Sequence, residues 1–141
     1  MIRYLDSAEG IHASDLQGFF VDWPSAPSPD RHLELLRNSD EVMLAVDDET
    51  GTVVGFVTAI TDGVLAAYVP LLEVLPEHHG RGIGRELMTR ILARLGDYYM
   101  VDLVCEPDLQ PFYERLGMRP AFGMITRNYG AQGGREPEVG T

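Results

Sequence analysis

Apolar residues recur at helical spacing across the middle of the chain. From residue 83 onward they stand mostly three or four positions apart, at Ile83, Leu87, Met88, Ile91, Leu92 and Leu95. Polar residues occupy the opposite face, namely Arg85, Glu86, Thr89, Arg90 and Arg94. This pattern predicts an amphipathic helix with one face on a core and the other in solvent. Gly96 predicts the C-terminal end of that helix.

Runs rich in apolar and β-branched residues predict the strands of a sheet. Two of these runs, residues 41–46 and 52–60, are joined by Asp47-Asp48-Glu49-Thr50-Gly51, which predicts a hairpin. Asp62-Gly63 then predicts the turn that leads into a further strand. The other predicted strands are residues 1–5, 64–75, 99–105 and 121–129.

Local capping signals predict two helices in the N-terminal third of the chain. Ser14-Asp15-Leu16-Gln17 has the form of a capping box, and the helix it opens would carry Leu16, Phe19, Phe20 and Trp23 and stop at Pro24. Ser28 as N-cap, with Pro29 at the first helical position, predicts a second helix that reaches about Asn38. The two short helices, joined by a Pro-rich loop, would form a wall of a small-molecule pocket.

Taken in order, the elements predict a mixed α/β sheet flanked by helices. The helix of residues 83–95 connects the strand that ends at Leu75 to the strand that ends at Cys105, and a helical crossover makes such strands parallel. Their ends can splay at Pro76, where a ligand would enter. We expect one domain, residues 1–129, followed by a flexible, polar and glycine-rich tail, residues 130–141.

Composition and charge narrow the class of protein. The 141 residues are 45% hydrophobic and 23% charged, which is typical of a folded globular domain. A net charge of -11 disfavours nucleic acid and anionic membranes as partners and mildly favours a cationic ligand. The N-terminus shows no signal-peptide pattern, no apolar run is long enough to span a membrane, and the single cysteine excludes an internal disulfide. We therefore expect a cytoplasmic protein.

The turn before the central helix carries the clearest chemical signal. Gly80, Gly82 and Gly84 leave backbone N–H groups uncovered at the positive end of the helix dipole, where they can cradle a phosphate or pyrophosphate. Arg81 and Arg85 add positive charge, whereas Arg90 and Arg94 are expected to lie on a solvated helix face with i,i+4 pairing. The G-x-G-x-x-G motif of dinucleotide-binding proteins is incomplete here, because its last glycine is missing. The chain contains no lysine, so it can form neither a Walker-type phosphate loop nor a Schiff base with a substrate.

Two motifs resemble those of the GNAT N-acetyltransferase superfamily. His79-Gly80-Arg81-Gly82-Ile83-Gly84 is similar to that family's acetyl-coenzyme A loop, with His79 in place of its glutamine or arginine. Phe112-Tyr113-Glu114-Arg115-Leu116-Gly117-Met118 is similar to its Phe-Tyr-Glu motif, on a helix that Asp108 or a neighbour would cap. The likeness covers most of residues 1–129.

The resemblance implies a mostly antiparallel, twisted sheet whose splayed parallel strand pair holds the cofactor. It also implies that acetyl-CoA is a co-substrate. The diphosphate would lie on residues 79–85, and the pantetheine arm would bond the backbone near Val74 and Leu75. Glu106 stands where many members have an asparagine that orients the pantetheine.

Acetyl transfer to an amine requires a base, an oxyanion donor and an acid for the leaving thiolate. Tyr113 matches the family's tyrosine and is the candidate acid, with a core aromatic residue as the alternative. Glu73, on the strand before Pro76, is the candidate base, with an ordinary exposed carboxylate or a water chain as alternatives. The Val74 N–H is the candidate oxyanion donor if the strand carries a bulge there.

Competing chemistries have weaker support in the sequence. Cys105 raises a route through an acetylated thiol, but no partner base is evident. No third residue stands at the spacing that a metal site with His78 and His79 would need, so we expect no bound metal ion. The function predicted is an N-acetyltransferase that acts on a small-molecule or peptide amine by direct attack in a ternary complex. A coenzyme A-binding sensor is the alternative from another class. A protein-modifying acetyltransferase and a homodimer also stay open.

Overall fold

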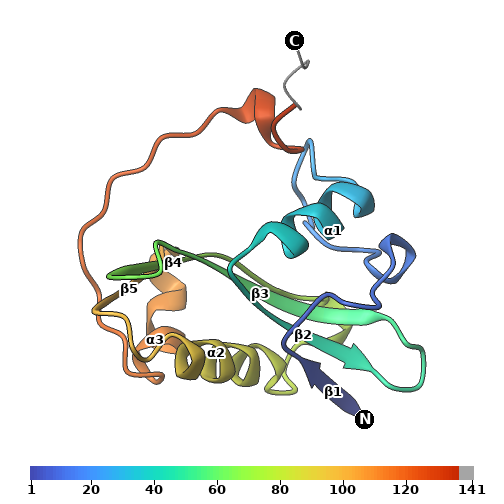
Figure 1. Ribbon diagram of the computed structural model, residues 1–141, viewed down its shortest axis with the longest axis horizontal. Helices are drawn as coiled ribbons and strands as arrows, with labels where there is room; N and C mark the ends of the chain where they lie inside the picture. The colour runs from blue at the N-terminus through green and yellow to red at the C-terminus, as the bar shows by residue number, and fades with distance from the viewer. Residues whose placement is uncertain (137–141) are drawn as a thin grey trace.

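A single sheet runs through the protein between two layers of helix (Figure 1). The computed structural model describes residues 1–136. The strands are β1 (Ile2–Leu5), β2 (Glu41–Asp47), β3 (Val53–Thr61), β4 (Ala66–Val74) and β5 (Met100–Asp102). The α-helices are α1 (Pro29–Asn38), α2 (Ile83–Arg94) and α3 (Gln110–Glu114). Short 3₁₀ turns are η1 (Ala13–Asp15), η2 (Pro76–His78), η3 (Pro107–Leu109) and η4 (Tyr129–Ala131).

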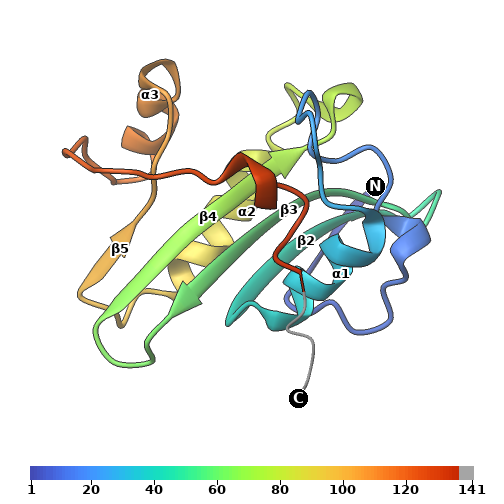
Figure 2. The ribbon, with the colours of Figure 1, turned by 90° about the horizontal axis from the view of Figure 1, so that it is seen from above.

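The strands follow one another across the sheet in chain order, and only the last pair is parallel. β1, β2, β3 and β4 pair antiparallel, whereas β4 and β5 pair parallel across the α2 crossover. Parallel pairing extends only from Ala66–Met100 to Tyr68–Asp102. Beyond it the two strands diverge into a wedge, seen from above in Figure 2. The predicted mixed sheet with a splayed parallel pair is therefore confirmed.

Helix α2 covers one face of the sheet and forms the larger core. Its side chains Leu87, Met88 and Ile91 are completely buried and pack with Met43 and Val57 of the central strands. Because the adjacent position on β3 is glycine, the helix can approach closely. A Cβ atom added at Gly55 would lie 3.1 Å from a Leu87 methyl and 3.3 Å from methyl groups of Ile83 and Val74.

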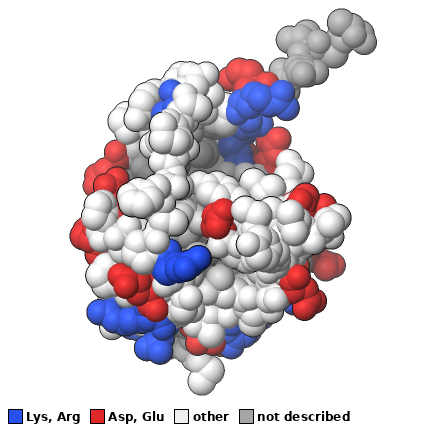
Figure 3. All heavy atoms as spheres, turned by 90° about the vertical axis from the view of Figure 1, so that its left-hand side faces the viewer, with Lys and Arg blue, Asp and Glu red and all other residues white. Residues whose placement is uncertain are grey.

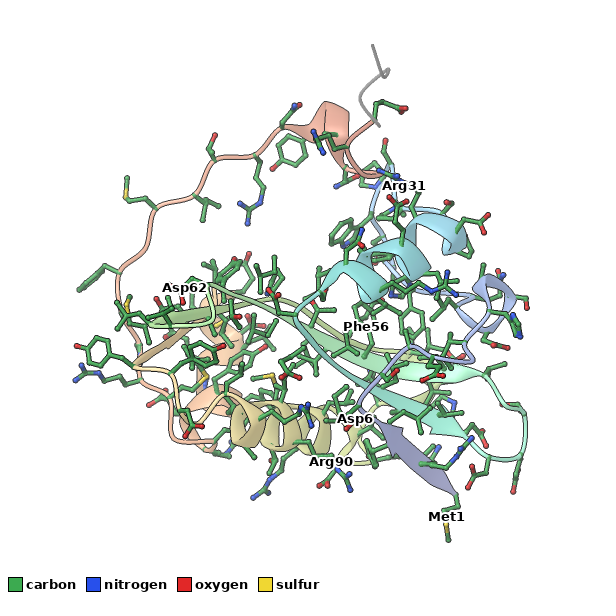
Figure 4. All side chains as sticks on the ribbon, in the orientation of Figure 1. Met1, Asp6, Arg31, Phe56, Asp62 and Arg90 are labelled. Atoms are coloured by element: carbon green, nitrogen blue, oxygen red, sulfur yellow. The ribbon has the colours of Figure 1, made fainter. Side chains whose placement is uncertain are left out.

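Helix α1 covers the opposite face, and its capping follows the sequence prediction. The Ser28 side chain accepts a hydrogen bond from the Arg31 N–H, and Pro29 occupies the first helical position. Leu33 and Leu36 pack on Phe56, whose side chain lies between the sheet and α1 (Figure 4). The two central strands are thus covered on both sides.

The predicted helix around residues 14–23 is wrong. Only the single 3₁₀ turn η1 forms, and it is closed by the Asp15 carboxylate, which accepts from the His12 N–H at 2.9 Å. Gly18, Phe20 and Asp22 all have positive φ angles, which a right-handed helix cannot accommodate. Of the aromatic residues expected here, Phe20 is buried, Phe19 is partly buried and Trp23 is 40% exposed.

The predicted strand at residues 121–129 is also absent. Within the described residues this segment is extended and exposed, and no neighbouring strand pairs with it. The helix that carries Tyr113 is shorter than predicted, and Asp108 lies inside η3 rather than capping it. In the predicted tail, residues 130–136 include part of η4 and contact the loop before α1, while residues 137–141 lie outside the described range.

His32 on α1 is buried in a pocket of aromatic rings. It is 1% exposed, and the rings of Phe19, Phe20 and Phe56 surround it at centroid distances between 4.4 and 5.3 Å. Among the described residues, neither of its ring nitrogens has a hydrogen-bond partner. Burial lowers the pKa of His32 from 6.5 to about 4, because the charged imidazolium is poorly solvated there.

We predict that the free energy of unfolding falls as the pH drops from about 6.5 to about 4. The unfolded chain protonates His32 at the higher pH and the folded chain only at the lower, so acid favours unfolding by up to roughly 3 kcal/mol. Urea denaturation across this range measures it. The His32→Phe variant should lose this component, and parallel curves for both proteins would contradict the prediction.

Candidate active site

The glycine-rich turn leads from β4 through η2 into α2 and leaves an open surface at the start of that helix. Gly80 has a φ angle of 77° and Gly82, the N-cap of α2, has 79°, a region that other residues rarely adopt. A Cβ atom at either position would meet nothing within 4 Å. The first intrahelical bond runs from Glu86 N–H to Gly82 C=O, so the preceding N–H groups of the first turn have no intrahelical partner.

The edge of β4 that faces the wedge is unpaired where it approaches this turn. The Leu75 N–H donates to the Val54 carbonyl of β3 at 2.8 Å, and alternation along a strand directs the Val74 backbone groups to the opposite edge. His79 Nε2 lies 2.7 Å from the Val74 carbonyl oxygen on that edge. A carbonyl can only accept, so His79 Nε2 is the donor. The Val74 N–H therefore faces the wedge.

A bulge in β4 determines which of its backbone groups face the wedge. Between the pairs Thr58–Leu71 and Ile60–Tyr68, β4 has one residue more than β3, within Val69-Pro70. An extra residue reverses which edge each backbone group faces. The bulge lies four residues before Val74, rather than at Val74 itself. Proline has no N–H to pair, which suits it to a bulge.

The charged side chains predicted near the turn divide into two groups. Arg81 and Arg85 are exposed beside it, and Arg81 donates to His78 Nδ1 at 2.7 Å. Arg90 forms the predicted i,i+4 pair with Glu86 at 2.8 Å. The i,i+4 pairing predicted for Arg94 is wrong, because it bonds Glu41 on β2 at 2.7 Å and Asp6 at 3.3 Å. The Ile83 side chain is buried in the core, so only its backbone can reach a ligand.

Helix α3 packs beside the first turn of α2. A Cβ atom at Gly84 would lie 3.8 Å from the Phe112 ring, and the Phe112 and Tyr113 rings meet edge to face at 4.9 Å. Tyr113 is half-buried, and burial raises the pKa of its phenol, with the negative charge that the nearby Cys105 carries when ionised adding to the rise. The phenol thus stays protonated at neutral pH and can donate a hydrogen bond.

Cys105 lies after the end of β5 and has poor conditions for forming a thiolate. Burial raises the pKa of its thiol, and the negative charges of Glu106 and Asp108 raise it further. A reactive cysteine requires the opposite surroundings, with positive charge that stabilises the thiolate.

Glu73 joins β4 to the irregular loop that sequence analysis had assigned to a helix. Its carboxylate oxygens accept from the Phe20 N–H at 2.9 and 3.0 Å and from the Val21 N–H at 3.3 Å. Phe20 and Asp22 hold φ angles of 60° and 67°, which are unfavourable for residues other than glycine. The hydrogen bonds to Glu73 help to hold this conformation. No short motif in the sequence indicated the contact, which joins residues 53 positions apart.

A small cavity of about 150 Å³ lies behind this loop. Its walls are residues 16–20, Pro27, Pro29 and His32. The described residues contain no cluster of three metal-ligating side chains. Of the helices in residues 1–136, none has the length and apolar character needed to cross a bilayer.

Comparison with known proteins places this geometry among acetyltransferases. The family model described as "Acetyltransferase (GNAT) family" matches residues 8–118. A crystal structure of a putative acetyltransferase from Deinococcus radiodurans R1 is 44% identical, covers 96% of this chain and 94% of its own, and superposes with a TM-score of 0.93. A GNAT family acetyltransferase from Streptococcus pneumoniae TIGR4 is 28% identical over 91% of this chain and 98% of its own, with a TM-score of 0.73.

Among curated proteins, an uncharacterized N-acetyltransferase of Porphyra purpurea is 26% identical over 119 residues, which cover 81% of this chain and 68% of that protein. The fold is also shared with AAC(6')-Iy, whose structure holds a bisubstrate analogue that contains CoA, at 17% identity and a TM-score of 0.66.

Proposed function

The chain belongs to the GNAT acetyltransferase family, and from that premise we propose that it transfers an acetyl group from acetyl-CoA to a primary amine. The observation that carries the proposal is the open glycine turn at the start of α2, which lies beside the unpaired edge of β4. The N–H groups of the turn are suited to a diphosphate, and the strand edge is suited to the amide groups of pantetheine.

The residues that would hold acetyl-CoA are those of the turn and the strand edge. Backbone N–H groups of residues 80–85 would bind the diphosphate, with Arg81 and Arg85 adding charge. Val74 would offer its N–H to the thioester oxygen, where negative charge develops as the amine attacks. Leu75 already bonds Val54 through its N–H and His78 through its carbonyl, so we assign it a supporting role.

His79 would act here as a positioning residue. Its side chain donates to the Val74 carbonyl and so connects the turn to the strand whose N–H faces the thioester. This use differs from a direct phosphate contact. The similarity to the acetyl-coenzyme A loop of the family then depends on the backbone N–H groups of the turn, and not on the side chain of His79 at the first position of the loop.

Tyr113 would protonate the leaving thiolate. Its phenol is half-buried, protonated at neutral pH, and held by Phe112 beside the first turn of α2. The thiolate of coenzyme A, with a pKa of about 8.5, leaves more readily when a hydrogen-bond donor is close.

Glu73 would receive the proton of the attacking amine, directly or through water. A primary amine with a pKa of about 10.4 is mostly protonated at neutral pH and must lose a proton before it attacks. The carboxylate lies on β4 next to Val74 and is oriented by the loop amides of Phe20 and Val21.

Direct attack in a ternary complex is supported over an acetylated thiol, because burial and the neighbouring acids keep Cys105 protonated. The acidic charge of the chain favours a cationic amine, either a small molecule or a peptide. The single cysteine supports a cytoplasmic location.

The decisive experiment measures CoA binding by calorimetry and thiol release with a panel of primary amines. We expect both, and we expect Gly82→Asp to weaken binding at least about tenfold, because it places a carboxylate where phosphates bind. Gly51→Asp is the matched control, since Gly51 has a φ angle of 75° and equally open surroundings in the β2–β3 turn. Binding without thiol release would favour a coenzyme A sensor, and no binding would refute the proposal.

For Tyr113→Phe we expect kcat to fall by roughly 10²-fold with the affinity for acetyl-CoA unchanged, because only the proton donor is removed. Steady-state kinetics and calorimetry on the same preparation measure the two quantities. Tyr99→Phe, at an exposed tyrosine before β5, is the control and should behave as the wild type. Unchanged turnover in Tyr113→Phe would remove this residue from the mechanism.

For Glu73→Gln we expect kcat/KM for the amine to fall by roughly 10²-fold or more, because the amide cannot take a proton. An amide oxygen in the place of Oε2 can still accept from the Phe20 and Val21 N–H groups, so the loop should keep its conformation although one acceptor is lost. The exposed Glu77→Gln serves as control. If Glu73→Gln is active while Glu73→Ala is not, Glu73 only holds the loop and another group is the base.

A further inference from the structure

His32 is a buried polar side chain without a partner. It is 1% exposed, and among the described residues neither of its ring nitrogens has a hydrogen-bond partner. A polar group buried in apolar surroundings is unfavourable unless something supplies the missing hydrogen bonds. A ligand that brings a polar group to the imidazole would supply one of them.

His32 lines the cavity of about 150 Å³ behind the loop of residues 16–20. That is about the volume of an apolar protein cavity that binds benzene. The other walls are Pro27, Pro29 and the loop, which contributes Phe19 and Phe20. None of the described residues in these walls is acidic or an arginine. The cavity is therefore suited to one flat, uncharged ring, which packs well against aromatic side chains.

The imidazole of His32 adds a requirement for a polar group on that ring. Because burial lowers its pKa to about 4, His32 is neutral at neutral pH. A neutral imidazole has one N–H donor and one acceptor nitrogen. A hydroxyl group both donates and accepts, so it can bond to either nitrogen. The cavity therefore favours a ring that carries a hydroxyl group over a plain hydrocarbon ring.

The cavity lies beside the candidate base, Glu73. The rings of His32 and Phe56 meet at a centroid distance of 4.4 Å, and Phe56 stands opposite Glu73 in the β3–β4 register. Residues opposite one another on antiparallel strands share a face of the sheet, with Cβ atoms about 5 Å apart. That face is covered by α1, as the place of Phe56 in Figure 4 shows. The Phe20 N–H, in the cavity wall, also donates to the Glu73 carboxylate at 2.9 Å.

The surface near the wedge favours an acceptor with one positive charge over a polycation. On the face that contains β5 and α3, uncharged side chains predominate and most acidic ones lie toward its margin (Figure 3). A polycation is bound best where several acidic groups gather. An acceptor with one amine for Glu73 and one ring for the cavity fits this surface.

We propose that the cavity binds the ring of the acceptor, and that His32 selects a ring with a hydroxyl group while the amine of the same molecule lies at Glu73. The acceptor is then a primary amine that a short aliphatic chain joins to a hydroxylated aromatic ring. This inference rests on the proposed acetyl transfer and adds the chemical class of the acceptor.

The wild-type protein tests the inference with three amines that differ in one feature each. Tyramine has the ring and the hydroxyl, phenethylamine has the ring alone, and butylamine has neither. We expect kcat/KM, measured by thiol release, to be higher for tyramine than for either of the others by about tenfold or more, because only tyramine both fills the cavity and pairs with His32. If either of the other amines reacts as well as tyramine, this inference is overturned and acetyl transfer still stands. No thiol release with any amine would overturn both.

The His32→Phe variant tests the role of the imidazole. Phenylalanine fills a similar volume but offers neither donor nor acceptor. The ratio of kcat/KM for tyramine to kcat/KM for phenethylamine should therefore fall by about tenfold or more. His12→Phe, at an exposed histidine before η1, is the matched control and should keep the wild-type ratio. An unchanged ratio in His32→Phe would overturn the inference, and circular dichroism checks that both variants are folded.

A direct measurement on the wild-type protein does not depend on the folding of a variant. In NMR spectra recorded with coenzyme A present, titration with tyramine should shift the ring resonances of His32 until they saturate. The resonances of the exposed His12 should stay where they are. Saturable binding of tyramine that leaves the His32 resonances unchanged would place the ring elsewhere and overturn the inference.

Discussion

The close approach of α2 to β3 is the contact on which the site depends. It is possible because residue 55 is glycine, which lets Ile83 and Leu87 pack directly on the strand. The same contact fixes where the helix begins, and so fixes the position of the N–H groups in its first turn. Those groups meet the end of β4 because η2 spans only three residues. The packing of α2 on β3 in the core therefore positions the exposed N–H groups at the start of α2.

Elements with local signals were predictable from the sequence. Ser28 and Pro29 located the start of α1, the period of apolar residues located α2, and the turn around Gly51 located the β2–β3 hairpin. The glycine turn was predictable because its glycines are visible in the sequence, and the φ angles of Gly80 and Gly82 lie in a region that other residues rarely adopt. The β4 bulge carried no such local signal, apart from Pro70.

Other parts depend on contacts between residues distant in the chain. The loop around Phe20 was predicted as a helix from the capping-box pattern at Ser14-Asp15-Leu16-Gln17, yet Glu73, far along the chain, accepts from its amides where the backbone is left-handed. Residues 121–129 have the composition of a strand, but a strand forms only beside another strand, and none pairs with this segment in the described residues. Local sequence signals were a poor guide in both places because tertiary contacts decide the backbone there.

The shortness of the β4–β5 ladder has an energetic consequence. With only three residue pairs joining the strands, the wedge beyond Tyr68 exists before any ligand arrives. An incoming chain of amide groups can bond to the β4 edge without first separating protein from protein. The free energy of its new hydrogen bonds is then not offset by broken ladder bonds, and the site is preorganised for an extended ligand.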